Sequence, residues 1–370
     1  MKRDHRINRI RHHDRLTRAA AGHCTVSGSD SSLLSSNRHD SKLEDGVCAE
    51  ALDVGLRAGT PSRFRSIVVP LDGEQFAEHA LPHALAIARR AGAEIQLVHV
   101  HSPLQSAYQP HRLYYDSGLD GFLLRTQQKY LDDMGRRLRK VSPVPVTPVF
   151  LQGREIADSL CEAVSTGTDL IVMATHGRGP LGRFWFGGIA DVLMRRLSVP
   201  LLFVRGHQAP VDLTGDPLVR QVLIPLDGSA VAEQILEPAL TLGTLRNAEH
   251  TLLRVIPLVV DYSFGYYSSG LQRSLADTRQ AEAWSYLRQV VAPLRDRKLR
   301  VRPDLAIAEG PAARTILHYS QKHDVDLIAL ATRGLGGLTR LFNGSVADQV
   351  IRGASVPVLV YRPKAEGGER

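Results

Sequence analysis

Two stretches of the sequence share one pattern. Residues 169–183 read DLIVMATHGRGPLGR and lead to FGGIAD at 186–191, while residues 326–340 read DLIALATRGLGGLTR and lead to NGSVAD at 343–348. Each begins with a short apolar run typical of a buried parallel strand and continues through a glycine-rich loop toward an expected helix. Glycine lets the backbone approach a ligand closely, and the free N–H groups at a helix start attract anions. The pattern therefore predicts a phosphate-binding loop in each stretch.

The two stretches belong to a larger duplication. Residues 66–73 read SIVVPLDG and residues 221–228 read QVLIPLDG, so that Asp72 and Asp227 lie 155 positions apart. A repeat of this length is a whole domain rather than a solenoid unit. In each copy apolar runs alternate with helical patterns over short connections, which requires a parallel, doubly wound sheet. We therefore expect an α/β protein of two tandem Rossmann-like domains, each with a five-stranded parallel sheet and a ligand site beyond the carboxyl ends of its strands.

The duplication also sets the expected domain boundaries. Residues 64–206 form the first domain and residues 219–363 the second, joined by a linker at 207–218 that is rich in Pro, Gly and Asp. Residues 1–63 lack hydrophobic periodicity and are rich in Arg, His and Ser, so we expect a disordered basic tail, with a second short tail at 364–370. The histidines of the long tail fit no standard set of metal ligands, and no metal site is assigned.

Composition limits the choice of partners and compartment. The net charge is +8, but the first 18 residues carry seven basic and two acidic side chains, so most of the excess belongs to the tail. We expect no nucleic-acid partner beyond weak contacts of that tail. No apolar run is long enough to span a membrane, and the N-terminal residues lack the apolar segment of a secretory signal. Three scattered cysteines indicate a reducing compartment, and we expect a cytoplasmic protein.

A dinucleotide-binding fingerprint also matches the first loop, but its context is wrong. Residues 177–182 satisfy G-x-G-x-x-G, which in that fold follows the first strand and is followed by an acidic residue after the next strand. Here the motif follows the fourth strand, the next strand ends in Arg205, and the second copy has Thr339 where the last glycine belongs. A Walker A loop is absent as well, because the chain contains no Gly-Lys dipeptide.

A different pattern fits both loops. It reads Ala174-x2-Gly177-x9-Gly187-Gly188 in the first copy and Ala331-x2-Gly334-x9-Gly344-Ser345 in the second. With the Pro-Leu-Asp-Gly ending of the first strand in each copy, it resembles the universal stress protein family, whose nucleotide-binding pattern is Gly-x2-Gly-x9-Gly-(Ser/Thr). The resemblance covers residues 64–206 and 219–363. It implies an adenine nucleotide alpha hydrolase-like fold and a stress-response protein that binds ATP, with or without Mg²⁺, and is not an enzyme.

The resemblance assigns the site of the second domain most fully. Asp227 would hold the ribose or a metal-linked phosphate, Val255 would pack on the adenine, and Ser345 would donate a hydrogen bond to a phosphate. The complete expected set is Pro225, Leu226, Asp227, Val255, Ala331, Arg333, Gly334, Gly344, Ser345 and Val346. Ala331 replaces the first glycine of the family pattern, a small-for-small change that we expect to be tolerated.

The site of the first domain departs further from the family. The matching set is Pro70, Leu71, Asp72, Val100, Ala174, His176, Gly177, Gly187, Gly188 and Ile189. Gly188 stands where Ser or Thr is expected, and the loss of one hydrogen bond to a charged group costs about 1.5–3 kcal/mol, roughly ten- to a hundredfold in affinity. We therefore expect the second domain to bind nucleotide more tightly than the first. At every position the alternative remains that the glycine serves a turn with positive φ.

For several other residues, and for the function itself, the sequence leaves more than one role open. Arg183 and Arg340 either contact phosphate or pair with Asp191 and Asp348, and the tyrosine pairs at 114–115 and 266–267 either cover the nucleotide or pack between domains. By the resemblance the terminal strands, at 200–204 and 357–361, would meet to form an intramolecular pseudo-dimer, and two chains could associate further as a homodimer. The rival functions are a partner-binding protein without nucleotide and a slow ATP hydrolase, although no general base is placed opposite a γ-phosphate.

Overall fold

The computed structural model describes residues 64–103, 108–109, 112–113, 117–164, 167–175, 188–207, 209–217, 219–257, 269–308, 310–332 and 346–363. The tail at 1–63, most of both glycine loops and both tyrosine pairs lie outside these residues, so the predictions made for them are not addressed by the fold. Among the described residues no helix is both long and apolar enough to cross a membrane.

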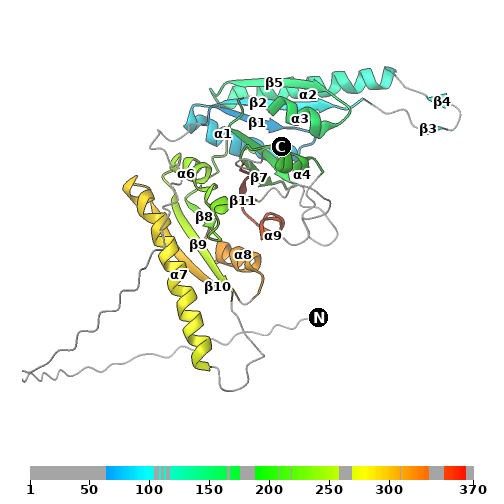
Figure 1. The fold of residues 1–370 in the computed structure, drawn as a ribbon. Coiled ribbons are helices and arrows are strands. Elements are labelled where there is room, and N and C mark those ends of the chain that lie inside the picture. Colours follow the sequence, from blue (N-terminus) through cyan, green and yellow to red (C-terminus); the bar gives the residue numbers. More distant parts are fainter. Residues whose placement is uncertain are drawn as a thin grey trace, which may run out of the picture. The chain divides into compact units, whose positions relative to one another are not determined.

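The first half of the chain alternates strands and helices in the predicted order (Figure 1). Its elements are β1 (Ser66–Pro70), the 3-10 helix η1 (Ala77–His79), α1 (Ala80–Ala91), β2 (Glu94–His101), β3 (Tyr108–Gln109), β4 (Arg112–Leu113), α2 (Ser117–Val141), β5 (Val146–Gln152), α3 (Ile156–Val164), β6 (Leu170–Thr175), α4 (Gly188–Arg196) and β7 (Leu201–Arg205).

The second half repeats this order. Its elements are β8 (Gln221–Pro225), α5 (Ala230–Glu233), α6 (Leu236–Thr244), β9 (Glu249–Pro257), α7 (Ser269–Asp296), β10 (Val301–Ala308), α8 (Ala312–Lys322), β11 (Leu327–Ala331), α9 (Val346–Gly353) and β12 (Val358–Tyr361). Figure 1 shows the long helix α7 lying along β9 and β10, which are the strands that it contacts.

Ten of the described strands form one sheet in the order β10-β9-β8-β11-β12-β7-β6-β1-β2-β5. Within this sheet all pairs inside each half are parallel, and β7 pairs with β12 in antiparallel register, with Leu202 opposite Leu359. Within each half the order of the five strands is 3-2-1-4-5, which is a doubly wound arrangement. The predicted fold class is therefore confirmed in both halves. The strand expected at an edge because of its prolines, β5, does lie at one end of the sheet.

One polar contact at the start of the first strand is repeated in both halves. The Asp169 carboxylate accepts hydrogen bonds from the backbone N–H groups of Arg65 at 2.7 Å and Ser66 at 3.0 Å. The Asp326 carboxylate accepts the equivalent bonds from Arg220 at 2.7 Å and Gln221 at 2.9 Å. In each half the aspartate precedes the fourth strand, so it fixes the first and fourth strands side by side. The ligand crevice of a doubly wound sheet lies between the same two strands but at their opposite, carboxyl ends.

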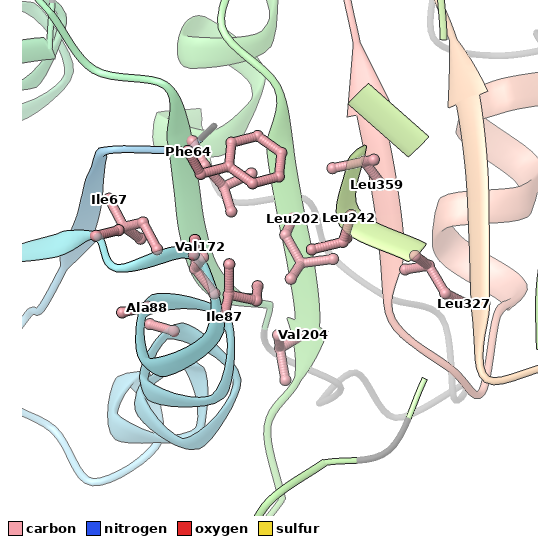
Figure 2. Packing of buried hydrophobic residues seen from close by; sticks show 14 of the residues in the cluster. Phe64, Ile67, Ile87, Ala88, Val172, Leu202, Val204, Leu242, Leu327 and Leu359 are labelled. Carbon is pink, nitrogen blue, oxygen red and sulfur yellow. The ribbon is translucent and has the colours of Figure 1, made fainter. Parts of the chain in front are cut away.

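Two hydrophobic cores cover the two faces of the sheet. One core includes Leu81 of α1 and Leu131 of α2, and the other includes Leu160 of α3 and Leu193 of α4, all nearly inaccessible to solvent. Side chains at alternate strand positions pack into the two cores, since successive side chains of a β-strand point to opposite faces of the sheet. Figure 2 shows Leu202 of β7, Leu242 of α6 and Leu359 of β12 close together, so one core runs across the β7–β12 pairing.

Several local expectations differ from the structure. The region at 101–118, which the sequence predicts as a long loop, contains the short β3–β4 pair, and the segment after Gly228 forms α5 and α6 in keeping with the repeated order of strands and helices. The helix expected to open at Gly153 begins at Ile156. The sequence leaves open whether Pro82 kinks its helix or lies near the first turn, and in the structure it lies in the first turn of α1, where its missing N–H costs no helical hydrogen bond. Helix α1 ends at Gly92 with φ 67°, as its glycine predicts.

Candidate functional site

The candidate site of each half lies where its first and fourth strands end side by side. In the second half Pro225 ends β8 and Ala331 ends β11, and the two strands are parallel neighbours. In the first half the corresponding strands are β1 and β6. Connections leave these neighbouring strands in opposite directions, which makes the position a topological switch point and the usual ligand crevice of such a sheet.

The turn after β8 is organised by Asp227. One oxygen of its carboxylate accepts hydrogen bonds from the Ser229 backbone N–H at 2.9 Å and the Ser229 hydroxyl at 2.5 Å. The Ser229 hydroxyl oxygen in turn accepts from the Ala232 N–H and caps α5. Gly228 has φ 80°, a conformation that side chains other than glycine rarely adopt. The turn therefore holds an exposed carboxylate in a fixed position at the mouth of the crevice.

A basic residue that the sequence analysis did not identify lies beside this turn. The Arg254 guanidinium donates to the Leu226 carbonyl at 3.3 Å and lies 5.9 Å from the centre of the Tyr286 ring. A Cβ added at Gly228 would lie 3.3 Å from the same guanidinium. Arg254 immediately precedes Val255, the residue expected to contact adenine. A permanent positive charge thus lies next to the strand ends of the second half.

Helix α7 is tied to the same region by a hydrogen bond. The Tyr286 hydroxyl donates to the Glu233 carboxylate at 2.9 Å, and burial together with this carboxylate raises the pKa of the Tyr286 phenol. The bond joins α7 to α5, the short helix that follows the Asp227 turn. Helix α5, which follows the turn, is therefore connected to a residue of α7 that lies 53 positions beyond Glu233 in the sequence.

The first half has the same plan with different residues. The Asp72 carboxylate accepts from the Glu74 N–H at 2.8 Å, next to Gly73 with φ 92°. His99, which aligns with Arg254, donates from Nδ1 to the Leu71 carbonyl at 2.9 Å. Tyr130 donates to Glu78 at 3.2 Å, and Glu78 also accepts from Arg137 at 3.2 Å. Glu78 and Glu233 are 155 residues apart, as are Asp72 and Asp227. The repeat spacing could therefore have identified both glutamates from the sequence.

The end of β2 carries buried polar side chains that β9 lacks. His101 Nδ1 is 2.8 Å from the Gln127 amide oxygen, and its Nε2 is 3.3 Å from the Asp120 carboxylate. The Phe150 ring stacks on both His99 and His101. At the position of His101 the second half has Ile256. The two crevices therefore differ in charge, with imidazoles beside Val100 and a guanidinium beside Val255.

The structure describes part of each expected site. In the first half it places Pro70, Leu71 and Asp72 at the end of β1, Val100 near the end of β2, Ala174 in β6, and Gly188 and Ile189 at the start of α4. In the second half it places Pro225, Leu226 and Asp227 at the end of β8, Val255 in β9, Ala331 at the end of β11, and Val346 at the start of α9. His176, Gly177, Gly187, Arg333, Gly334, Gly344 and Ser345 lie outside the described residues.

The two aspartates after the glycine loops are each paired within their own helix. Asp191 forms an ion pair with Arg195, and Asp348 accepts from Arg352 at 2.7 Å. Burial raises the pKa of the Asp348 carboxyl, Arg352 opposes that rise, and the nearby Asp191 charge adds to it. The expected alternative partners, Arg183 and Arg340, lie outside the described residues. No group of three or more His, Cys, Asp or Glu side chains within the described ranges is arranged to hold a metal ion.

Comparison with known proteins assigns the family. The sequence model of the universal stress protein family matches residues 63–205 and again residues 219–362, which together are well over half of the chain. The chain therefore belongs to the universal stress protein family and contains two tandem domains of it, as the resemblance predicted.

Individual relatives agree with this assignment. Universal stress protein MJ0531 of Methanocaldococcus jannaschii is 29% identical over 153 residues, which are 41% of this chain and 88% of that protein. Universal stress protein Rv2005c of Mycobacterium tuberculosis is 28% identical over 203 residues, 54% of this chain and 63% of its own length, so this match spans less than two thirds of that relative. A crystal structure of a universal stress protein from Archaeoglobus fulgidus has a TM-score of 0.58 at 16% identity, and the match covers 82% of this chain and 98% of that one, which shows the shared fold.

Proposed function

We propose that the protein is a stress-response regulator or sensor that binds an adenine nucleotide, ATP, in the crevice of its second half and carries out no catalysis. The observation that carries the proposal is the grouping of Asp227, Val255 and Ala331 at the carboxyl ends of three strands of one parallel sheet. The ribose, adenine and phosphate contacts expected from these residues need such a grouping. Bound Mg²⁺, if present, would reach the site with the phosphates.

The second half is favoured over the first by charge and by hydrogen-bond donors. Arg254 supplies a permanent positive charge beside the Asp227 turn, where the first half has His99. Ser345 supplies a hydroxyl where the first half has Gly188. A nucleotide with several negative charges gains from both differences, because hydrogen bonds to charged groups are the stronger ones.

The two halves are proposed to act as a dimer within one chain. The antiparallel pairing of β7 with β12 supports this, because it joins the last strand of each half directly. Further association of two chains through other surfaces is an extension of the same proposal. A cytoplasmic location, expected from the scattered cysteines, also stays a proposal.

The test begins with the nucleotide that the purified protein retains, identified by mass spectrometry. Dissociation constants for ATP, ADP, AMP and cyclic AMP then establish the preference, the last because one solved universal stress protein is in complex with cAMP. Ser345→Ala should weaken ATP binding roughly ten- to a hundredfold through the lost donor. Asp227→Asn should weaken it as well, while the matched change Asp72→Asn in the first half should leave the tighter site unaffected.

Three results would contradict the proposal. An unchanged dissociation constant for ATP in Ser345→Ala would show that the nucleotide does not bind in the assigned pocket. Absence of retained nucleotide together with absence of measurable binding would favour a partner-binding protein. Phosphate release above the rate without protein would favour the hydrolase.

A further inference from the structure

An arginine without a partner lies at the end of the last strand of the second half. Arg362 directly follows β12 and is partly buried. Its Nε atom is buried and has no hydrogen-bond partner among the described residues. A buried donor that lacks an acceptor is costly, and more so when its group is charged. Arg362 therefore gains from a negatively charged partner that the described part of the chain does not supply.

Arg362 lies next to the strand end where the crevice of the second half opens. Strands β11 and β12 are parallel neighbours, with Ala331 opposite Tyr361. The Thr332 backbone N–H donates to the Tyr361 carbonyl at 2.9 Å, so Arg362 follows at the level of Thr332. Thr332 is the first residue of the connection that leaves β11. The arginine thus lies one strand away from the switch point between β8 and β11.

The alternation of β12 assigns the side chain of Arg362 to one face of the sheet. Val358 and Val360 are buried in the core beneath α8 and α9, whereas Leu359 is buried in the other core. Because successive strand side chains point to opposite faces, Arg362 belongs to the face of Val358 and Val360. Val255 of β9 packs against that same core. The residue expected to contact adenine and the unpaired arginine therefore share one face of the sheet.

Three strand spacings separate Val255 from Arg362. The strand order β9-β8-β11-β12 places Val255, Asp227, Thr332 and Arg362 at or near successive strand ends. Neighbouring strands lie about 4.8 Å apart, so this row is about 14 Å long. With adenine on Val255 and ribose at Asp227, as proposed for this crevice, the phosphate chain runs across β11 toward β12. A nucleoside triphosphate reaches Arg362, whereas a monophosphate is shorter by two phosphate groups and ends near β11.

The charge and shape of the arginine suit a terminal phosphate. A guanidinium stays protonated and offers parallel N–H groups that match two oxygens of a phosphate. Arg254, a second cation beside this crevice, already donates to the Leu226 carbonyl. Asp348 of α9 is paired with Arg352, and Arg362 forms no ion pair with the acidic side chains of the described residues. Its positive charge is therefore available to a ligand.

The first half has an arginine at the equivalent position with different surroundings. Arg362 follows Arg205 by 157 positions, as Pro357 follows Pro200. Arg205 ends β7 opposite Thr175 of β6, is exposed and already has an interaction of its own. The two halves thus differ at this position, and Arg205 provides a matched control.

We propose that Arg362 binds the phosphate group furthest from the ribose and so makes the crevice of the second half selective for nucleoside triphosphates over monophosphates. This proposal rests on the nucleotide site proposed above. Arg362 donates from Nε and from one terminal nitrogen to two oxygens of that phosphate. ADP, whose chain is one phosphate shorter than that of ATP, binds with intermediate affinity.

Isothermal titration of the full chain with ATP, ADP and AMP measures this selectivity. The unaltered protein should bind ATP at least about tenfold more tightly than AMP. Arg362→Gln should weaken ATP binding about ten- to a hundredfold, as expected for a lost hydrogen bond to a charged group, and should change AMP binding by less than about twofold. Arg362→Lys keeps the charge without the paired donors and should retain part of the preference. Arg205→Gln should change neither affinity of the tighter site.

Two further measurements distinguish a phosphate contact from a structural role. The Nε–H signal of Arg362 in NMR spectra should shift when ATP is added and stay in place when AMP is added. Because this N–H has no partner among the described residues, Arg362→Gln should not lower the unfolding temperature of the protein without nucleotide. A residue that holds the fold together would lower it.

The proposal is overturned if Arg362→Gln leaves ATP binding unchanged, weakens ATP and AMP binding equally, or has the same effect as Arg205→Gln. In these cases nucleotide still binds, and the proposed function stands without this residue. If the unaltered protein binds neither ATP nor AMP, the proposed function fails and the selectivity proposal fails with it. The titration of the unaltered protein therefore separates the two failures.

Discussion

The hydroxyl of Tyr286 donates a 2.9 Å hydrogen bond to the carboxylate of Glu233, and this bond joins α7, the longest described helix, to α5, the short helix that follows the Asp227 turn. The first half contains the same bond between Tyr130 and Glu78 at 3.2 Å. In each half a residue near the carboxyl end of the first strand is thus tied to a helix that begins far along the chain.

Replacing Tyr286 by Phe should lower the free energy of unfolding by about 1.5 kcal/mol, because a half-buried carboxylate loses its hydrogen bond. The matched change Tyr130→Phe should cost less, since Glu78 keeps its bond from Arg137 at 3.2 Å. Urea unfolding of the two variants measures the difference. Equal losses would show that Arg137 does not compensate for the missing hydroxyl.

Asp216 should contribute to stability through its two arginines. Asp216→Asn is expected to lower the free energy of unfolding by about 1 kcal/mol, a modest value because these ion pairs are partly exposed to solvent. The loss should shrink at high salt, which screens exposed charges. The control is Asp212→Asn, whose carboxylate bonds the neighbouring Thr214 and makes no tie between the halves. The expectation fails if both variants lose the same stability and show the same salt dependence.

His83 should make the protein less stable in acid. Its pKa is lowered from 6.5 to about 4, chiefly by burial, so the folded state binds fewer protons than the unfolded state between these values. The contribution is fully present above pH 6.5 and is lost as the pH falls toward 4. His83→Gln should therefore flatten the fall in stability over this range, as followed by urea unfolding at several pH values. The control His318→Gln, at an exposed position of α8, should leave the dependence of the unfolding free energy on pH unchanged. An equal effect of both changes would show that other groups cause this dependence.

Two glycines inside helices should respond to alanine with opposite signs. A Cβ at Gly243 of α6 would lie 2.0 Å from Nε2 of the buried His250, so Gly243→Ala should cost about 2 kcal/mol through overpacking. At Gly121 of α2 the nearest atom would be 3.5 Å away on the flexible Arg125 side chain. Gly121→Ala should therefore stabilise the protein by about 0.5–1 kcal/mol, as helix propensity alone predicts. Thermal or urea unfolding decides the sign, and a stabilising Gly243→Ala would contradict the packing.

The sheet could be predicted from the sequence because its central strands are largely buried. Runs such as 327–331 are continuously apolar, and β11 occupies these residues. The repeat spacing then showed which residues of the two halves correspond, and the match of both halves to the universal stress protein family model confirms the duplication. Helix α9 begins at Val346, after the second glycine-rich stretch, as the repeated order of elements predicted.

The surroundings of the candidate site could not be predicted in the same way. Arg254 gave no local signal, because its role comes from contacts with Leu226 and Tyr286, residues distant in the sequence. Helix α6 contains Pro238 and Gly243, which weaken a helical pattern, and it is stabilised by packing of Leu236 and Leu240 in the core. The assigned phosphate contacts of Gly334, Gly344 and Ser345 stay predictions.

The antiparallel register of β7 and β12 has a consequence for how the protein can be used. The strands of the sheet run in one direction in the first half and in the opposite direction in the second. The carboxyl ends of the two sets of strands, and with them the two crevices, therefore face in opposite directions along the strand axis. A ligand in one crevice cannot bridge to the other, and a protein partner that covers one edge leaves the second edge accessible. The two crevices are connected through the centre of the sheet, where Leu202 lies opposite Leu359, and through Asp216, which bonds Arg90 of the first half and Arg246 of the second.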